Sequence, residues 1–596
     1  MAENNGEEKL LAVARHIAKS LGHTDNTMAH DILQIFSNFD GRFKEKLHSS
    51  HMNPDQTFNM LHQRISKYLT VDQPIWSNYS SDVSLFLNSI DELTVFVREN
   101  SDSSCIERAE NLLQQCMFRL EDEFKTLLEQ GGGDQEDPNS DTMEENFDEF
   151  DDVPVARQVT DYDVIIDALP SGTIKDLHDI MKRMVGSGYG KECSLAYSDS
   201  RRDFINESLS RLGVIDSGNL VNDDNIVEIE KWAKAIKMAV KVFYPSERRL
   251  CDRVFGYSPT TAEAADMSFM DVCRVSVMEL LNFANGIAMG SRAPDRLFKI
   301  LDVYEVVKDL LPEFEVLFSD QYCLFLRNEA VSVWKRLRES IKGVFVELEN
   351  LIRRDPVKSA VPGGGLHPIT RYVVNYLSAA CSRPILEQVF DDDSDRSVGV
   401  ESSSLSTQVA WIMEVLEGNL ESKSKVYRDP ALSSVFMMNN GRYIAKKIKD
   451  DKMGLILGDD WIRKQKSKVR QHHVNYQRNS WHKILNTLKL DNSNLPSNVA
   501  SKSLKDKLKL FNSQFEDTCR TQSTWAIFDE QLREELKISV AGTLLPAYRN
   551  FLGRFHNIQD IGKYADKHVK FTIEDVEVRI DRDLFQATAI SGSSRK

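Results

Sequence analysis

The segment closest to a catalytic motif is a glycine-rich stretch, VGSGYGKECS, in which Lys191 follows glycines at 186, 188 and 190. A phosphate-binding loop needs one more residue between its outer glycines, a Ser or Thr after the lysine to hold magnesium, and a preceding strand. Here Glu192 follows the lysine, and the residues before the glycines have helical periodicity. We therefore expect a turn that ends a helix, and no nucleotide site.

Other residue types that could perform catalysis or hold a metal lack the required spacing. His472, His473 and His482 are not accompanied by a metal motif such as HExxH. The chain has no GxSxG nucleophile motif. Its eight cysteines are scattered without a CxxC pair, as expected for thiols in a reducing compartment. We predict a protein that is not an enzyme, with no cofactor, no metal and no disulfide.

Basic residues near the C-terminus could bind an anionic surface, although the net charge of the chain is −16. If the segment before Thr572 is helical, Lys563, Lys567 and Lys570 project on one side of it, at spacings of four and three. Thr572 and Asp575 would then form a capping box that opens a last amphipathic helix. This pattern predicts a lipid-binding site at the three lysines.

A second basic stretch runs from 442 to 483. It is either a solvated helix face that pairs with acidic neighbours or an auxiliary membrane patch. The patch would consist of Lys446, Lys447, Arg463, Lys464, Lys466, Lys468 and Arg470. An alternative function is nucleic-acid binding, in which aromatic side chains of this stretch stack on bases. Those aromatic residues are Tyr443, Trp461, Tyr476 and Trp481, whose helical spacing also fits burial in a core.

The elements that position these residues are predicted to be helices. Amphipathic stretches with a period near 3.6 recur along the chain and are separated by short polar or Gly/Pro breaks, whereas alternating strand patterns are almost absent. A chain of 596 residues is too long for one compact core. We therefore predict an all-α fold, an elongated rod of stacked antiparallel helical bundles.

Two features divide the N-terminal part from the rest. Heptad spacing predicts an apolar stripe that packs on another helix, either of this chain or of a partner. The stripe comprises Ile106, Leu113, Leu120 and Leu127, with Met117 and Phe124 beside them. From Gly131 to Asp152 a glycine triplet and dense Asp and Glu predict a hinge without a stable fold.

The predicted organisation follows from these breaks. It comprises 1–130, a helical coiled-coil-like segment; 131–160, an acidic disordered linker; 161–430, the helical-bundle rod body; 431–586, a basic helical bundle that faces the membrane; and 587–596, a flexible tail. Pro362–Gly365 and the stretch that begins at Asp391 are expected to be surface loops between bundle layers.

The N-terminus predicts a cytoplasmic protein. Its apolar positions are interrupted by Arg15, His16 and Lys19, which indicates an amphipathic helix and not a signal peptide. No apolar run reaches the ~18 residues that a membrane span needs. We expect any contact with a membrane to be peripheral.

Several sequence strings occur in the same order as in one known family. They are GYGKECSLAYSDSRRDFINESLSRLG, PSERRLCDRVF, GLHPITRYVVNYL, VFMMNNGRYIAKKIK with LGDDWIRKQKSKVRQHHVNYQRNSW, and QLREELKISVAGTLLPAYRNFLGRF. Together they resemble the seventy-kilodalton subunit of the exocyst, and more closely its plant branch, from about residue 161 to 585. The ending RIDRDLFQATAISGSSRK departs from the family pattern, which leaves the packing of the last turn open.

The resemblance implies a subunit that tethers secretory vesicles to the plasma membrane before fusion. Its N-terminal part would bind other exocyst subunits, and its C-terminal bundle would bind phosphoinositides and Rho-type GTPases. The family's lipid-contacting Lys-x-x-Lys pair falls on Lys567 and Lys570. The protein would associate with the plasma membrane and with secretory or autophagy-related vesicles, and not with nucleic acid. The sequence leaves open the cargo and pathway (secretion, immunity or autophagy), the lipid headgroup, the GTPase, and whether the N-terminal segment packs on the rod or on another subunit.

Overall fold

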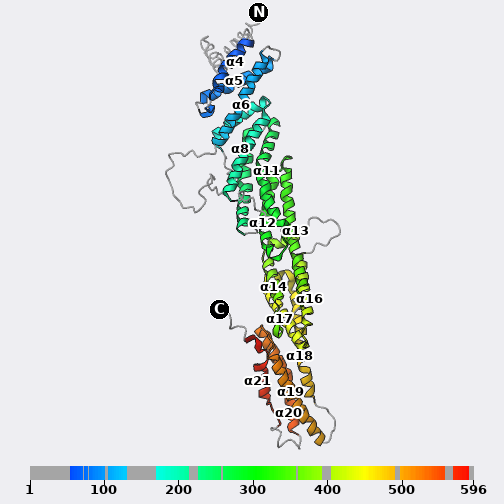
Figure 1. Cartoon of the computed structure of the whole chain (residues 1–596). Helices are drawn as coiled ribbons and strands as arrows, with labels where there is room; N and C mark the ends of the chain where they lie inside the picture. Colours follow the sequence, from blue (N-terminus) through cyan, green and yellow to red (C-terminus); the bar gives the residue numbers. More distant parts are fainter. Residues whose placement is uncertain are drawn as a thin grey trace, which may run out of the picture. The chain divides into compact units, whose positions relative to one another are not determined.

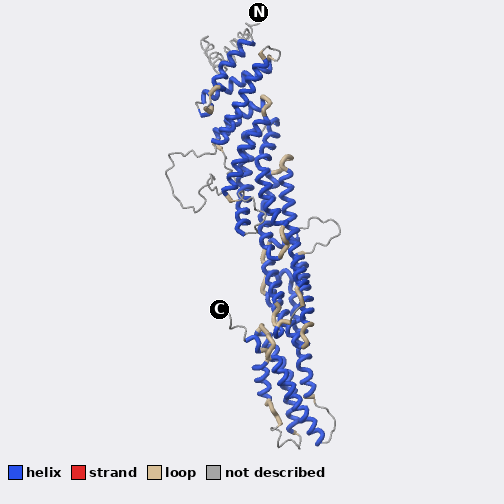
Figure 2. The backbone as a smooth tube through the Cα atoms, viewed as in Figure 1, coloured by secondary structure: helices blue, strands red, loops and turns tan. Residues whose placement is uncertain are grey.

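The computed structural model describes residues 54–71, 73–77, 80–100, 105–130, 169–213, 226–256, 259–357, 360–391, 404–489, 497–557 and 568–589. Throughout these ranges the regular elements are helices, with no strand (Figure 2). The prediction of an all-α fold is confirmed. Backbone contacts divide the chain into two compact units, and Figure 1 labels many of their helices. None of the described helices combines the length and the apolar character needed to cross a membrane.

The first unit contains the described residues within 1–216, 235–279 and 313–327. Its complete helices are α4 (Pro54–Leu69), α5 (Ser80–Glu99), α6 (Ile106–Gln130), α7 (Ser171–Gly186), α8 (Gly190–Arg211) and α10 (Tyr244–Phe255). The boundary with the second unit falls inside α9 (Ile226–Met238), α11 (Pro259–Met289), α12 (Leu297–Leu317) and α13 (Leu324–Arg354).

The apolar stripe of α6 is part of the core of the first unit. Leu120 and Phe124 are completely buried, and Met117 and Leu127 nearly so. The helix packs on α4, α5, α7 and α8 of the same chain. Packing within the chain therefore accounts for these four residues of the stripe, whereas Ile106 and Leu113 are half-buried. The acidic segment from 131 to 152 and the N-terminal amphipathic stretch lie outside the described residues.

A buried ion pair joins α8 to α10. Arg201 donates from Nε and Nη2 to one carboxylate oxygen of Glu247, at 3.0 and 2.9 Å, and Tyr197 donates its hydroxyl to the other at 2.6 Å. Cys251 donates its thiol to the Tyr197 hydroxyl. All of these side chains are almost completely buried, so the charges are shielded from water. Burial by itself would lower the pKa of Arg201, but the negative charge of Glu247 raises it.

The second unit contains the described residues within 217–234, 280–312 and 328–596. Its further helices are α14 (Pro368–Cys381), α15 (Ile385–Asp391), α16 (Leu405–Ser424), α17 (Pro430–Lys449), α18 (Lys452–Thr487), α19 (Ser497–Gln522), α20 (Glu530–His556) and α21 (Ile573–Asp583). Helix α18 packs on α14, α16 and α17 and also on α19 and α20. It therefore belongs to two successive bundles, which is the stacking that the sequence predicts.

The glycine loop before α14 lies at the surface only in part, because Pro362 is exposed whereas the glycines at its end are buried, and this corrects the prediction of a surface loop. Pro362–Gly364 forms one turn of 3₁₀ helix, and Gly364 and Gly365 are buried. Gly363 and Gly364 have φ angles of 64° and 69°, in the left-handed region where glycine is favoured. A Cβ on Gly364 would also come within 2.8 Å of the Leu432 side chain. Both the backbone conformation and the close packing on α17 require these glycines.

Two consecutive asparagines of α17 hold this loop. Asn440 accepts hydrogen bonds from the Thr370 hydroxyl at 2.7 Å and from the His367 amide at 3.0 Å. Asn439 donates to the carbonyl oxygens of Gly364 at 2.6 Å and Ala526 at 2.7 Å. The amide groups thus connect α17, the glycine loop and the segment before α20, because buried backbone carbonyls need donors.

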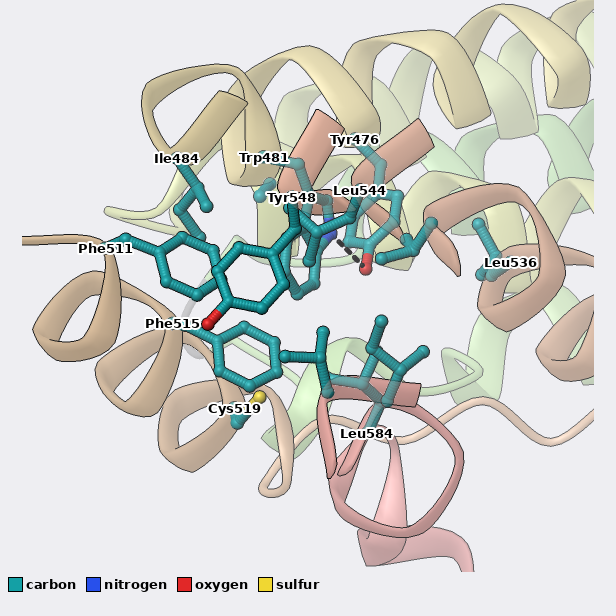
Figure 3. Packing of buried hydrophobic residues seen from close by; sticks show 14 of the residues in the cluster. Tyr476, Trp481, Ile484, Phe511, Phe515, Cys519, Leu536, Leu544, Tyr548 and Leu584 are labelled. Atoms are coloured by element: carbon teal, nitrogen blue, oxygen red, sulfur yellow. Dashed lines mark hydrogen bonds between the residues drawn. The ribbon is translucent and has the colours of Figure 1, made fainter. Parts of the chain in front are cut away.

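The C-terminal bundle is packed around aromatic side chains (Figure 3). Phe511 and Tyr548 stack with ring centres 4.4 Å apart, and both are completely buried. Leu584 and Phe585 lie in the same core, so the extended ending of the chain is packed at this point. The amide of Phe585 donates to the carbonyl oxygen of Gln522, which fixes the turn after α21. All eight cysteines of the chain are buried thiols.

Candidate functional site

The glycine stretch near residue 190 is a connection between helices, as predicted. Helix α7 ends at Gly186, and α8 begins at Gly190. The amide of Tyr189 donates to the carbonyl oxygen of Met184 at 2.8 Å, and Gly188 has a φ of 92°. These features close the last turn of α7 with a glycine in the left-handed conformation. No strand precedes the glycines in the described residues, so this segment does not have the architecture of a phosphate-binding loop.

Of the three lysines predicted to bind lipid, only Lys570 lies in the described part of the chain. Lys563 and Lys567 lie outside it. Residues 568–571 are not helical, so the predicted helical presentation of Lys570 is wrong. The physical reason is a tertiary contact, because the Tyr548 hydroxyl donates to the Phe571 carbonyl oxygen at 2.8 Å and holds the backbone there.

Lys570 is exposed but has an acidic partner. Its Nζ lies 2.6 Å from a carboxylate oxygen of Glu516, and the side chain is 54% exposed. Arg579 approaches the same oxygen at 3.7 Å. The guanidinium of Arg579 also lies 4.9 Å from the ring centre of Phe571. Arg579 also lies 3.3 Å from a carboxylate oxygen of Asp583, which pairs with Arg582 as well, so three cations share two carboxylates and the cluster keeps one net positive charge.

Arg579 was missed by the sequence analysis. It lies on α21, whose start is the predicted capping box: Thr572 and Asp575 exchange hydrogen bonds at 2.9 and 3.0 Å. The hydrogen bonds from Thr572 lower the pKa of Asp575. Since Arg579 follows Asp575 by one helical turn, the capping box fixes the register that brings Arg579 to Lys570. The four-residue spacing between Asp575 and Arg579 is the one feature of the sequence that could have indicated Arg579.

The auxiliary patch divides into paired and unpaired residues. On α18, Arg463 pairs with Asp460, and Lys468 pairs with Glu417 of α16. Lys464, Lys466 and Arg470 are exposed, and within the described ranges no carboxylate lies at ion-pair distance from them. Pairing with acidic neighbours therefore accounts for Arg463 and Lys468, and the auxiliary membrane patch stays a prediction for the three unpaired residues.

Lys446 and Lys447 belong to a different location, at the end of α17. Lys446 lies 3.2 Å from Asp529, the N-cap residue of α20, and is 71% exposed. Both lysines line a pocket with Phe528. The α18 cations do not line this pocket. The predicted auxiliary patch is thus two separate groups of residues.

The aromatic residues proposed to stack on nucleotides are largely unavailable. Tyr476 is completely buried and Trp481 nearly so, and the Trp481 indole donates to the Tyr476 hydroxyl at 3.1 Å (Figure 3). Tyr476 in turn donates to Gln522. Tyr443 donates its hydroxyl to Asn375 at 3.1 Å. The alternative of nucleic-acid binding through these side chains is not supported.

Comparisons with known proteins identify the class of protein that this fold represents. Residues 230–582 match the family model for the C-terminal part of the Exo70 exocyst complex subunit, and residues 57–130 match "Exocyst complex component Exo70 N-terminal". The first match covers more than half of the 596 residues. The chain therefore belongs to the Exo70 family of exocyst subunits. Members of this family are not enzymes, which confirms that prediction.

Individual relatives place the chain in the plant branch of the family. It is 54% identical to "Exocyst complex component EXO70B1" of Arabidopsis thaliana, over 99% of each chain. It is 46% identical to "Exocyst complex component EXO70B2" of the same plant, over 97% of this chain and 98% of the relative. The crystal structure of the S. cerevisiae exocyst component Exo70p has the same fold, with a TM-score of 0.60 at 13% identity, and the match covers 89% of this chain and 99% of that one.

Proposed function

We propose that this chain acts within the exocyst to tether secretory vesicles to the plasma membrane before fusion. Its C-terminal bundle would bind phosphoinositides, and its N-terminal helices would bind other exocyst subunits. The protein would be cytoplasmic and peripherally associated with the plasma membrane and with secretory or autophagy-related vesicles. The observation that carries this proposal is the match to the Exo70 family across both parts of the chain.

The charge distribution of the C-terminal bundle supports a membrane contact. Lys570, Arg579 and Arg582 share the carboxylates of Glu516 and Asp583, so the cluster retains one positive charge, to which Lys563 and Lys567 would add. Each basic residue near an anionic leaflet contributes about 1 kcal/mol, so a small group of lysines is enough for reversible, salt-dependent recruitment. Lys464, Lys466 and Arg470 on α18 are available as an auxiliary group.

Exposed apolar side chains support a protein contact by the N-terminal helices. Leu85 on α5 and Phe118 on α6 are 57% and 52% exposed, whereas Leu120 of the stripe on α6 is completely buried. Large apolar groups left in water are typical of surfaces that bind a partner. We propose these side chains as contacts for other exocyst subunits. A Rho-type GTPase would bind the C-terminal bundle.

Liposome binding by the full-length chain tests the membrane contact. Replacing Lys563, Lys567 and Lys570 together by Glu should weaken binding to vesicles of phosphatidylcholine with a phosphatidylinositol bisphosphate by about a hundredfold or more. Vesicles of phosphatidylcholine alone should bind neither protein. A second variant with Glu at Lys464, Lys466 and Arg470 reports the auxiliary group.

A matched control reverses three exposed lysines elsewhere, Lys182, Lys191 and Lys335. It changes the net charge by the same amount and should bind vesicles better than the terminal variant. Equal loss in both variants would mean that net charge alone governs binding, and the three-lysine site would be rejected.

Co-precipitation with purified exocyst subunits tests the protein contact. The full-length chain with Leu85→Asp and Phe118→Asp should lose its partners while it still binds phosphoinositide vesicles. Loss of both activities would indicate unfolding, and circular dichroism would detect it. Retention of all partners would reject this surface.

A further inference from the structure

Two neighbouring pockets of the second unit lie along α14 and α17, away from the residues discussed above for lipid binding at the C-terminus. One has a volume of about 570 Å³ and is lined by Pro368, Arg371 and Tyr372 among others. The other has a volume of about 520 Å³, and its lining includes Lys447 and Phe528. Leu366 lines both pockets. We refer to the two together as the α14–α17 groove.

The framework of the groove is fixed by hydrogen bonds before any ligand arrives. The buried amides of Asn439 and Asn440 connect α17 to the glycine loop that carries Leu366. The Tyr443 hydroxyl, from the second pocket, donates to Asn375, which lines the first. A surface held in this way loses little conformational entropy on binding, which favours affinity.

Aromatic side chains of the groove are exposed and positioned. Phe528 is 56% exposed, and its ring lies so close to Gly365 that a Cβ there would be 2.9 Å from it. Tyr372 is 42% exposed and stacks on Tyr376 with ring centres 6.0 Å apart. Exposed aromatic residues held in a rigid concave surface are typical of protein-binding sites.

Two of the carboxylates that line the groove already have hydrogen-bond or ion-pair partners. Asp529 already accepts from the Leu532 amide and pairs with Arg442 and Lys446. Asp451 caps α18 and accepts from the Ser378 hydroxyl.

In contrast, Arg371 and Lys447 are exposed, and no carboxylate of the described residues lies at ion-pair distance from them. Asp450 is an exposed carboxylate of the lining that, among the described residues, has no such partner either. Arg371 and Lys447 are therefore free to pair with carboxylates of a ligand, whereas the oxygens of Asp451 are already occupied by the Lys452 amide and the Ser378 hydroxyl.

We propose that the α14–α17 groove binds an extended peptide segment of a partner protein that carries an aromatic side chain and acidic residues. The aromatic side chain packs on Phe528 or Tyr372, and the carboxylates pair with Lys447 and Arg371. The site is distinct from the three C-terminal lysines, and the inference does not depend on membrane binding.

The test is a selection of random peptides displayed on phage against the full-length chain, followed by titration of the selected peptide as a synthetic, labelled probe. We expect selected sequences that combine Phe, Tyr or Trp with Asp or Glu. The variant with Phe528→Ala and Lys447→Glu should bind that peptide about a hundredfold more weakly. Arg371→Glu, which changes a single residue in the first pocket, should weaken peptide binding by a smaller factor.

The matched control combines Val346→Ala and Lys335→Glu, which removes one exposed apolar group and reverses one exposed lysine on α13, away from the groove and from the proposed lipid-binding residues. It should bind the peptide as the parent does. Circular dichroism and the thermal midpoint check that all variants fold.

Several outcomes would overturn the proposal: no enrichment of any peptide, selected sequences without acidic residues, or binding that survives both groove variants. A groove variant that loses phosphoinositide vesicles and keeps the peptide would assign the groove to the membrane instead.

Discussion

Two buried polar networks stabilise the two units, and they differ in charge. In the first unit the carboxylate of Glu247 accepts from Arg201 and Tyr197, so the network is ionic. In the second unit Asn439 and Asn440 bind neutral groups, most of them backbone amides and carbonyls. An ion pair between two helices can be exchanged for apolar side chains, whereas backbone groups of a loop cannot be removed.

The two networks also give a structural role to the sequence strings that carry the family resemblance. The Glu247 network connects SLAYSDSRRDF with PSERRLCDRVF, and the asparagine network connects GLHPITRY with VFMMNNGRY. In each case, strings far apart in the chain meet through polar side chains that bridge one element to another. These sequence strings therefore supply the polar contacts that connect one element of the fold to another.

The largest expected effect comes from breaking the ionic network. Glu247→Ala leaves the Arg201 charge buried without a partner and should reduce the free energy of unfolding by about 3–5 kcal/mol. Urea unfolding measures the loss, and amide hydrogen exchange should localise it to α8 and α10. As a control, Asp517→Ala removes an exposed partner of Arg520 and should cost no more than about 0.5 kcal/mol. Equal effects in both variants would contradict the importance of burial.

A somewhat smaller loss is expected in the neutral network. Asn440→Ala leaves the Thr370 hydroxyl and the His367 amide without their acceptor, and should cost about 2–3 kcal/mol in unfolding free energy. Hydrogen exchange should increase at the glycine loop and at the start of α14. An unchanged exchange pattern there would show that the loop is held by other contacts.

Apolar replacement separates the two networks most directly. The triple variant Tyr197→Phe, Arg201→Met and Glu247→Leu removes the three polar side chains of the ion pair and leaves only the weak thiol donor of Cys251 unpaired, so its stability should stay within about 1 kcal/mol of the parent. Urea unfolding of this variant beside Glu247→Ala measures the difference. If the triple variant is as unstable as Glu247→Ala, apolar packing cannot replace the ion pair, and the ion pair itself stabilises the fold.

The smallest expected effect is the pH dependence of the stability that Asp529, next to the asparagine network, contributes. Burial would raise the pKa of Asp529, but the Leu532 amide, Lys446 and Arg442 together lower it. A carboxyl group whose pKa is lower in the folded state stabilises the fold above its unfolded pKa of about 3.9, and this contribution is lost as the pH falls through the folded pKa.

The difference in unfolding free energy between the parent and Asp529→Asn should therefore be constant near neutrality and shrink below about pH 4. Thermal unfolding across this range measures it. A difference that does not change with pH would mean that the Asp529 charge has no role.

Local patterns predicted much of this structure, because helical periodicity and capping act over a few residues. The apolar stripe through Leu120 and Phe124 and the capping box at Thr572 are of this kind. The burial of the glycine loop could not be predicted, since a Pro-Gly segment has no apolar periodicity and its partners Asn439 and Asn440 lie some 75 residues away.

The candidate sites were also hard to predict wherever contacts between distant parts of the chain decide the structure. Lys570 was predicted from helical spacing, but the tertiary hydrogen bond between Tyr548 and Phe571 decides its backbone conformation. The α14–α17 groove combines residues of α14 and α17 with Phe528, and no local spacing indicates such a combination.

The buried thiols give the chain a set of internal probes. Cysteines occur in both units, from Cys116 on α6 to Cys519 on α19, and burial raises the pKa of each of these two thiols to about 12. Since only the thiolate reacts with alkylating reagents, the folded protein should be inert to maleimide until a helix opens. The order in which the native cysteines become labelled would then give the sequence in which the bundles unfold, without any introduced dye site.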